Sequence, residues 1–581
     1  MAKKRVMREV NLVAASTPTR RLTVLAQDPS ITMNGAALTT RVRVPEEPTT
    51  PGPHGHRVRV IDFDASRGDY YAPYAMPGRF DEFDSVTDVD QLVSNPHFHA
   101  QNVYAIAMST LWQFEAALGR HVPWAFASRG HQLNIAPHAF ADANAFYSRE
   151  DEGLFFGYVP KRKGTVFTCL SFDVVTHETT HALLDGMRTA YMRPSSPDQA
   201  AFHEGFSDVI AILSVLKNAG VVERLLTRGS HRGDRGLITA EDARDQKLRE
   251  SVLFKLADEL GPELGSPSGQ ALRHSIDLEP SADYYTVQKR YEEPHRRGEI
   301  LVAAMMRAFL QVWGRRLDPL GRKRGIEMNL QLVAEEAATA AEQLMRMAIR
   351  ALDYCPPVDV SFRDYLSALA TADHEVVPDD GRHRYRRAVI DWFGRYGIQP
   401  AVNADVAGSA RGIWDPPPVM SYGGTHFETL RRDPDAVFRF IWRNQKALEI
   451  DTSAFTRVYF VRPCIRMGLD RFVVQETVAE YLQTIDLAAR DLGKYGIKKP
   501  KELPPGQPIR LYGGGTLIFD EFGRLKFHIG TGVKSRHQGE RIASMAERGY
   551  FHAQRQRDRR PFAELHRNRS YVTLNRLRES W

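Results

Sequence analysis

The chain has 581 residues, of which 43% are hydrophobic and 26% charged, and its formal net charge is +7. This length exceeds what one compact core normally holds, so several domain-sized units are expected. No run of about 18 apolar residues occurs, which excludes an ordinary membrane-spanning helix. Charged residues at positions 8 and 9 interrupt the place of a signal-peptide apolar stretch, so no secretory signal is predicted.

The cysteines and the charge distribution indicate where the protein is located and what it could bind. Cys169, Cys355 and Cys464 form no CxxC pair and no disulfide framework, so we expect buried thiols and a cytoplasmic location. Residues 531–581 hold 12 Lys/Arg against 5 Asp/Glu, whereas the preceding residues hold 66 of each sign. A solvated basic surface explains this tail, because no nucleic-acid module accompanies it; binding of nucleic acid or another acidic partner is the alternative.

The N-terminal part of the chain mixes strand and helix patterns. The first 57 residues end in a proline-rich stretch, 45–53, which predicts an extended linker. Residues 58–63 alternate like a strand, and the apolar spacing predicts a helix over 95–120. Two more strand-like segments follow, at 144–147 and 154–158.

Helical patterns dominate from Ser171 to about Gly397, at 172–187, 201–217, 299–313, 327–353 and 383–395. A composition shift from Pro400 to Pro418 predicts a boundary near 400. Beyond it we expect further helices and one hairpin, 516–519 with 525–529, and we interpret Gly513-Gly514-Gly515 as a turn. The predicted class is α+β, with an extension and linker (1–57), a strand-containing lobe (58–188), a helical lobe (189–398) and an additional C-terminal α+β domain (399–581).

A candidate metal motif lies in the first of these helices. His177 and His181 are four residues apart, which on a helix puts both imidazoles on one face. Glu178 is next to the first histidine, where its carboxylate can take a proton from water at the metal. Zinc prefers such ligands and keeps one position open in catalytic sites. An exposed helix face is the alternative, but apolar residues on both flanks favour a buried helix.

The third ligand is expected on the next helical segment. Glu204 and Asp208 are again four residues apart, and Phe202 and Phe206 indicate that this helix is packed. Glu204 can complete the metal site, and Asp208 can accept the second N–H of a ligand histidine. His203 is an alternative ligand.

Together these two segments resemble the thermolysin-like branch of the gluzincins, which pairs an HExxH helix with a second helix bearing ExxxD. The likeness covers roughly residues 60–398. It implies a two-lobed core, with the HExxH helix at the floor of a cleft. It also implies one zinc ion on His177, His181 and Glu204, general-base catalysis by Glu178, and endopeptidase cleavage of peptides or proteins before apolar residues.

The resemblance further implies substrate-binding residues. The strand that begins with Asn144 and Ala145 is similar to the family's edge strand, which binds an extended peptide through its backbone. Arg273 matches the arginine that holds the substrate carbonyl, and Leu272 and Val174 would line an apolar pocket. An ordinary strand and a surface arginine are the alternatives.

His295 resembles the histidine that stabilises the developing oxyanion, and Tyr191 falls near the family's oxyanion tyrosine. The family has an aspartate before that histidine; here Glu292 and Glu293 precede it, and either could orient its ring. The helix after Glu204 lacks the carboxylates of the calcium-binding members, so no structural calcium is expected there.

Two other functions are alternatives to an endopeptidase. A non-catalytic or partner-gated binding protein could use the same scaffold, although every expected ligand is present. A zinc aminopeptidase is the second, but the chain has no GxMEN-type exopeptidase motif. The resemblance covers neither residues 1–57 nor residues 399–581, and gating by the C-terminal domain is a hypothesis.

Overall fold

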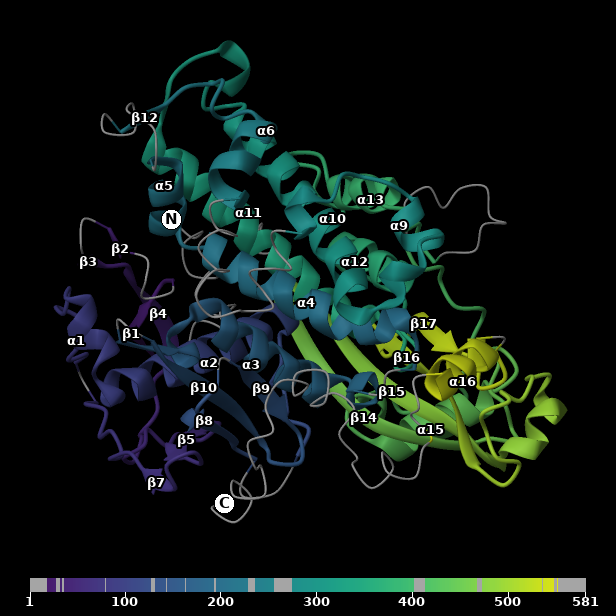
Figure 1. The fold of residues 1–581 in the computed structure, drawn as a ribbon. Coiled ribbons are helices and arrows are strands. Elements are labelled where there is room, and N and C mark those ends of the chain that lie inside the picture. The colour runs from purple at the N-terminus through teal and green to yellow at the C-terminus, as the bar shows by residue number, and fades with distance from the viewer. Residues whose placement is uncertain are drawn as a thin grey trace, which may run out of the picture.

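The computed structural model describes residues 18–27, 32–33, 36–78, 80–126, 131–142, 144–161, 164–192, 195–227, 236–254, 274–401, 413–467, 473–535, 537–547 and 551. Helices and strands both build the protein, so the predicted α+β class is confirmed. Figure 1 shows a strand-containing N-terminal region, a body of long helices and a separate C-terminal sheet. None of the helices in these ranges combines the length and hydropathy needed to cross a membrane.

The N-terminal region is built on a five-stranded mixed sheet in the order β11-β10-β8-β5. Strand β8 runs parallel to β5 and β10, whereas β9 and β11 pair with β10 in antiparallel fashion. Within the described residues β9 pairs with β10 alone, which makes it an edge strand. The bounds are β5 Val58–Val60, β8 Leu133–Phe140, β9 Ala145–Ser148, β10 Gly153–Lys161 and β11 Gly164–Phe167.

The residues before position 58 are more than the extension and linker that the sequence predicted. Strand β1 (Thr19–Leu25) pairs with β4 (Thr39–Pro45), and Val24 is buried in the main core. The proline-rich stretch is packed as well: Glu47 accepts a hydrogen bond from the Tyr104 hydroxyl of the long helix α2. The short elements nearby are β2 Thr32–Met33, β3 Ala36–Ala37, β6 Phe63–Asp64, β7 Asp69–Tyr70 and α1 Val89–Val93.

Long helices form the body of the protein, close to the ranges that apolar spacing predicted. In Figure 1, α4 crosses the middle of this body, and it packs against α3 on one side and α10 on the other. The main helices are α2 Pro96–Leu118, α3 Phe172–Met187, α4 Pro197–Leu216, α5 Ala219–Thr227, α10 Pro294–Leu317, α11 Leu330–Ala351, α12 Phe362–Val376 and α13 Tyr385–Arg395. Shorter elements are η2 Thr168–Leu170, η3 Thr189–Met192, β12 Leu237–Ile238, α6 Asp245–Leu248, η5 Arg249–Phe254, α9 Asp283–Thr286, η6 Lys289–Glu292, η7 Arg322–Arg324, β13 Met328–Asn329 and η8 Leu352–Tyr354.

Helix α3 is buried along its whole length, as its apolar flanks predicted. Three threonines on it would be costly to bury without hydrogen-bond partners. Thr176, Thr179 and Thr180 each donate a hydroxyl hydrogen bond to the carbonyl four residues back, at 2.7–2.8 Å. This local bonding satisfies the hydroxyls and allows a polar helix to lie in the core.

The C-terminal region contains a four-stranded antiparallel sheet in the order β14-β15-β16-β17. The predicted hairpin is its β16–β17 pair, but β14 and β15 were not predicted. The Gly513-Gly514-Gly515 run lies inside β16, so its interpretation as a turn is wrong. A Cβ on Gly513 would come within 2.4 Å of the Val533 amide nitrogen, which explains the need for glycine. The bounds are α14 Phe427–Leu430, α15 Pro434–Arg443, β14 Phe455–Met467, β15 Val473–Ala488, η9 Ala489–Tyr495, β16 Pro508–Phe519, β17 Leu525–Thr531 and α16 His537–Glu547.

A buried ionic network joins this sheet to the helical body. Asp353, in η8, accepts hydrogen bonds of 2.5 Å from Arg120 and from Arg466 of β14. Arg466 is also paired with Glu476 of β15, and Glu476 accepts the Tyr354 hydroxyl at 2.6 Å. All five side chains except that of Arg120 are essentially inaccessible, and Arg120 is 8% exposed. The predicted boundary near residue 400 therefore separates two regions that share a charged, buried interface.

Candidate metal centre

The two helices that carry the metal motifs pack against each other and bring the predicted ligands together. The Nε2 atoms of His177 and His181 on α3 lie 2.8 Å apart. From α4, the Glu204 Oε2 atom lies 3.7 Å from His177 Nε2 and 3.8 Å from His181 Nε2. All three side chains are buried. The i, i+4 spacing placed the histidines on one face, and helix packing supplied the carboxylate.

This donor set fits a zinc ion. In a tetrahedral site with bonds of about 2.0–2.1 Å, neighbouring ligand atoms are separated by roughly 3.3 Å. The three observed separations lie about half an ångström on either side of that value. Two imidazole nitrogens and one carboxylate, with a fourth position left over, match the donor set of catalytic zinc sites rather than that of closed structural ones.

Each ligand histidine is held by a partner on its other nitrogen. Asp208 Oδ1 lies 2.9 Å from His177 Nδ1, as the ExxxD spacing predicted. His181 Nδ1 lies 2.9 Å from His203 Nδ1 and 3.1 Å from Ser207 Oγ. His203 thus contacts the outer side of a ligand ring, and its alternative assignment as the third ligand is not supported by this geometry. Such outer contacts fix ring orientation and tautomer.

Asp208 also supplies charge. Burial acts to lower the pKa of His177, but the hydrogen bonds of Asp208 and Glu204 and the charges of Asp208 and Glu178 outweigh it and raise that pKa well above its usual value. The same negative potential favours a divalent cation at Nε2.

We expect Asp208→Ala to weaken zinc affinity by about 10- to 100-fold, because His177 loses the partner that orients it. Competition against a chromophoric chelator measures the Kd. Asp491→Ala, which removes a carboxylate from a surface pair with Lys494, should leave the Kd unchanged. An Asp208→Ala protein with the wild-type Kd would contradict this role.

Glu178 lies beside the ligand pair, and one of its carboxylate oxygens is within 4.8 Å of a ring nitrogen of each histidine. It is buried, at 4% exposure. Because adjacent residues on a helix diverge in direction, Glu178 is offset from the His177–His181 face. Glu204, which comes from the facing helix and lies within 3.8 Å of both Nε2 atoms, is the better candidate for the third ligand.

A glycine contact brings α10 up to this centre. Helices α4 and α10 approach most closely at Gly205 and Gly298; a Cβ on Gly205 would lie 2.9 Å from the Gly298 carbonyl oxygen. Gly205 follows the ligand Glu204, and Gly298 lies one turn after His295. Only residues without a Cβ permit this separation, which carries His295 to the metal ligands.

We expect Gly205→Ala to destabilise the protein by about 1–3 kcal/mol and to lower turnover, because α10 must move away from α4. Thermal unfolding and peptide kinetics measure both effects. Gly539→Ala on α16 is the matched control, since its Cβ would only touch Ile497 at 3.8 Å. Equal stability of the two variants would show that the close α4–α10 contact does not determine the stability of the protein.

His295 lies at the start of α10, half-buried, with its Nε2 atom 3.9 Å from Glu204 Oε2. Its Nδ1 atom lies 2.8 Å from Glu293 Oε1, which identifies Glu293 rather than Glu292 as the orienting acid. The second oxygen of Glu293 caps α10 by accepting the Arg296 amide at 2.8 Å. Burial lowers the pKa of His295, but Glu293 and Glu204 raise it to about 9, so the ring is cationic at neutral pH.

The predicted edge strand runs along α3. Tyr147 on β9 donates a hydrogen bond of 2.8 Å to Asp185, near the end of α3. Arg149 donates to the same carboxylate at 2.6 Å. Asn144 immediately precedes β9, and its side chain accepts the Ala145 amide at 2.9 Å. The two expected substrate-binding residues therefore lie just before the edge strand and at its first position, beside the metal-motif helix.

Four other predicted site residues have different outcomes. Tyr191 is 1% exposed, its hydroxyl donates to the Pro356 carbonyl at 2.6 Å, and its ring packs edge-on against Phe202. Its assignment as an oxyanion tyrosine is therefore wrong, because the hydroxyl points into the core. Val174 is buried one turn before His177. Leu272 and Arg273 lie outside the described residues.

Neither the family models nor the curated proteins that were compared with the chain gave a match. The case for function therefore rests on the geometry of these residues.

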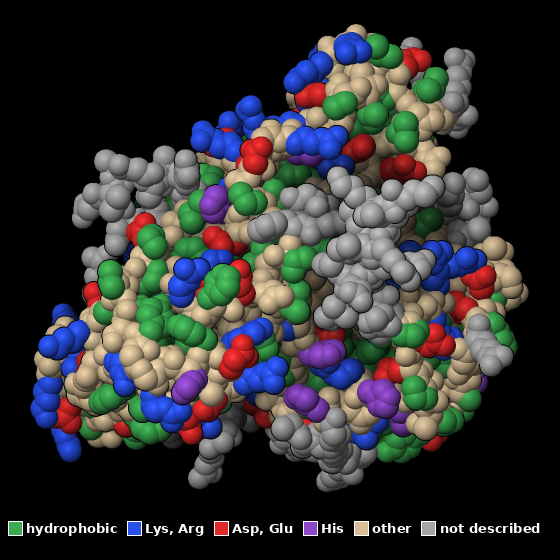
Figure 2. Space-filling model, turned by 180° about the vertical axis from the view of Figure 1, so that it is seen from behind, with side chains coloured by type: hydrophobic (Ala, Val, Ile, Leu, Met, Phe, Trp, Pro, Cys, Tyr) green, Lys and Arg blue, Asp and Glu red, His purple; other side chains and the backbone are tan. Residues whose placement is uncertain are grey.

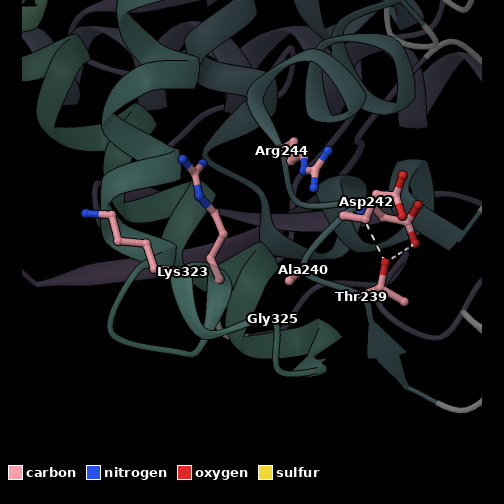
Figure 3. Close-up of a pocket in the computed structure, with 8 residues that line it drawn as sticks. Thr239, Ala240, Asp242, Arg244, Lys323 and Gly325 are labelled. Carbon is pink, nitrogen blue, oxygen red and sulfur yellow. Dashed lines mark hydrogen bonds between the residues drawn. The ribbon is translucent and has the colours of Figure 1, made fainter.

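Elsewhere the surface offers less specific features. Figure 2 shows Lys/Arg and Asp/Glu side chains interspersed among apolar ones on the face turned away from Figure 1. A cavity of about 700 Å³ lies near β12 and η7, and Figure 3 shows the residues that line it. Its Thr239 and Asp242 bond to each other, and Arg322 is paired with Asp245. None of the candidate site residues lines this cavity.

Proposed function

We propose that the protein is a zinc-dependent endopeptidase with a thermolysin-like, two-lobed core. The observation that carries the proposal is the convergence of His177, His181 and Glu204 on one point, with Glu178 and His295 beside it. Nitrogen and oxygen ligands with an open position are what a hydrolytic zinc site requires.

Each side chain has one part in the proposed reaction. When bound, Zn²⁺ acidifies water and polarises a carbonyl oxygen. Glu178 takes the proton of the attacking water and later delivers it to the leaving amine nitrogen. His295, held by Glu293 and cationic at neutral pH, donates a hydrogen bond to the negative charge that develops on the carbonyl oxygen.

Substrate binding is proposed for the edge strand. An extended peptide would add to β9 as a further strand, with Asn144 and Ala145 contacting its backbone. Arg273 is proposed to hold a substrate carbonyl, and Leu272 with Val174 to accept the apolar side chain that follows the cut.

Removal of zinc tests the proposal. We expect chelation to abolish peptide cleavage and lower Tm, and one equivalent of Zn²⁺ at this centre to restore cleavage, because the ligand carboxylate and imidazoles cannot activate water alone. Mass spectrometry of a cleaved peptide library should show internal cuts before apolar residues. Cleavage that survives removal of all bound metal would overturn the proposal.

The same library separates the other two functions. An aminopeptidase would release single N-terminal residues and would be blocked by N-acetylation of the peptides, whereas an endopeptidase is indifferent to it. A binding protein would retain peptides without cutting them, in the zinc-loaded form as well.

A further inference from the structure

A second group of metal-binding side chains lies in the core of the N-terminal region. His99 on α2, His138 on β8 and Cys169 in η2 bring one ligand atom each within 4.8 Å of one another. The histidines are each 1% exposed, and Cys169 is completely buried. Three elements that are distant in sequence thus meet at these side chains, and none of the residues belongs to the site already described.

The outward-facing nitrogen of each ring is already engaged. His99 Nε2 lies 2.9 Å from the Val93 carbonyl oxygen, and His138 Nδ1 lies 2.8 Å and 2.9 Å from the two Asp62 oxygens. A backbone carbonyl and a carboxylate are the usual outer partners of metal-bound histidines. The inner nitrogens, His99 Nδ1 and His138 Nε2, then face each other at 2.7 Å.

Hydrogen-bond direction shows what lies between the rings. The Val93 carbonyl can only accept, so His99 Nε2 carries the hydrogen and its Nδ1 carries a lone pair. The Asp62 carboxylate likewise keeps a hydrogen on His138 Nδ1. With hydrogens on both outer nitrogens, the inner nitrogens are the ones left to bind a metal ion between the rings.

We propose that His99 Nδ1, His138 Nε2 and the Cys169 thiolate bind a second Zn²⁺ ion with a structural role. Two imidazoles and a thiolate suit zinc, and the thiolate together with the Asp62 carboxylate balances its two charges. Binding releases the thiol proton of Cys169 to solvent. The rings then separate from 2.7 Å to roughly 3.3 Å. The fourth position is left to a non-protein ligand, as in catalytic sites, but the burial of all three donors keeps a substrate away from it.

The surroundings of this site favour a structural rather than a catalytic role for the ion. The ring of Phe167 lies 4.7 Å from that of His99, and the ring of Tyr71 lies 4.4 Å from that of His138, so aromatic side chains surround the donors. Cys169 precedes the first residue of α3 by three positions. An ion here ties α2 and β8 to the beginning of the helix that carries the HExxH motif.

Metal content of the full-length protein tests the inference. We expect two zinc ions per chain in the wild type and one in each of Cys169→Ser and His138→Gln. The His177→Ala/His181→Ala double variant should also keep one. Cys464→Ser, which alters another buried free thiol, is the matched control and should keep two.

Cobalt provides an independent readout. Co²⁺ bound by the double variant His177→Ala/His181→Ala should show a near-ultraviolet thiolate-to-cobalt charge-transfer band, and adding Cys169→Ser should remove it. The band itself is measured on a protein that retains Cys169, so this part of the test does not depend on whether a Cys169 variant folds. A wild type with one zinc that Cys169→Ser leaves in place, or a cobalt spectrum without that band, would overturn the second site. Either result would leave the proposed peptidase centre untouched, because its ligands contain no sulfur.

Discussion

Glu178→Gln is expected to lower kcat for peptide cleavage by about 10²- to 10⁴-fold while leaving the zinc content of the protein unchanged. The amide keeps the shape of the side chain, but it cannot take a proton from water. Glu178 is buried beside the ligand histidines without belonging to their shared face, so its loss should not release the metal. Steady-state kinetics and metal analysis on the same preparation measure the two effects.

The matched control is Glu342→Gln, which alters an exposed glutamate on α11 paired only with Arg346 among the ion pairs of the described residues. It should retain full kcat. Cleavage at the wild-type rate by Glu178→Gln would show that Glu178 is not the general base. Loss of zinc together with cleavage would instead make Glu178 a ligand, and the assignment of Glu204 would then fail.

Asp353→Asn is expected to lower the free energy of unfolding by about 3–5 kcal/mol, because it leaves the buried guanidinium groups of Arg120 and Arg466 without their shared carboxylate. Chemical denaturation measures this change. Asp486→Asn is the control: its ion pair with Arg510 is exposed and should contribute no more than about 1 kcal/mol. Equal effects of the two substitutions would show that the buried network does not hold the C-terminal sheet in place.

Acid unfolding gives a second test of the same residue. Burial acts to raise the pKa of Asp353, but Arg120 and Arg466 outweigh it and lower the pKa from 3.8 to about 2. A depressed folded-state pKa stabilises the protein above the unfolded-state value, and this stabilisation is lost as pH falls from about 4 to about 2. The stability of Asp353→Asn should therefore depend less on pH in that window than the stability of the wild type.

The network also bears on the role of the C-terminal domain. Truncation near residue 400 would remove Arg466 and leave Asp353 and Arg120 without it, so a loss of activity in such a protein could come from instability alone. Asp353→Asn keeps the whole chain and perturbs only the junction. A change in cleavage specificity in this variant, at temperatures where it remains folded, would support gating by the C-terminal region.

Local periodicity was sufficient to predict the features that depend on residue spacing within one helix. The four-residue spacings of His177 with His181 and of Glu204 with Asp208 place each pair on one helix face, whatever surrounds them. The apolar flanks likewise predicted that α3 is buried. The edge strand followed from its alternation and from its likeness to a known family.

Strands with polar residues at buried positions were harder to predict. Strand β15 buries Glu476 and Glu480 against arginines of other elements, so its pattern does not alternate as a half-buried strand should. The N-terminal hairpin was missed as well, because its partner strands β1 and β4 are separated by more than ten residues and their pairing is not a local property.

The sequence by itself thus determined the ligand types, their helical spacing and the α+β class. Only the tertiary structure decided that Glu293 orients His295, that Tyr191 points into the core, and that the C-terminal sheet shares a buried interface with the helical body. The physical reason is that a helix sets the relative positions of residues three or four apart. The meeting of α3, α4 and α10 instead depends on side-chain packing and on the Gly205–Gly298 contact between residues far apart in the chain.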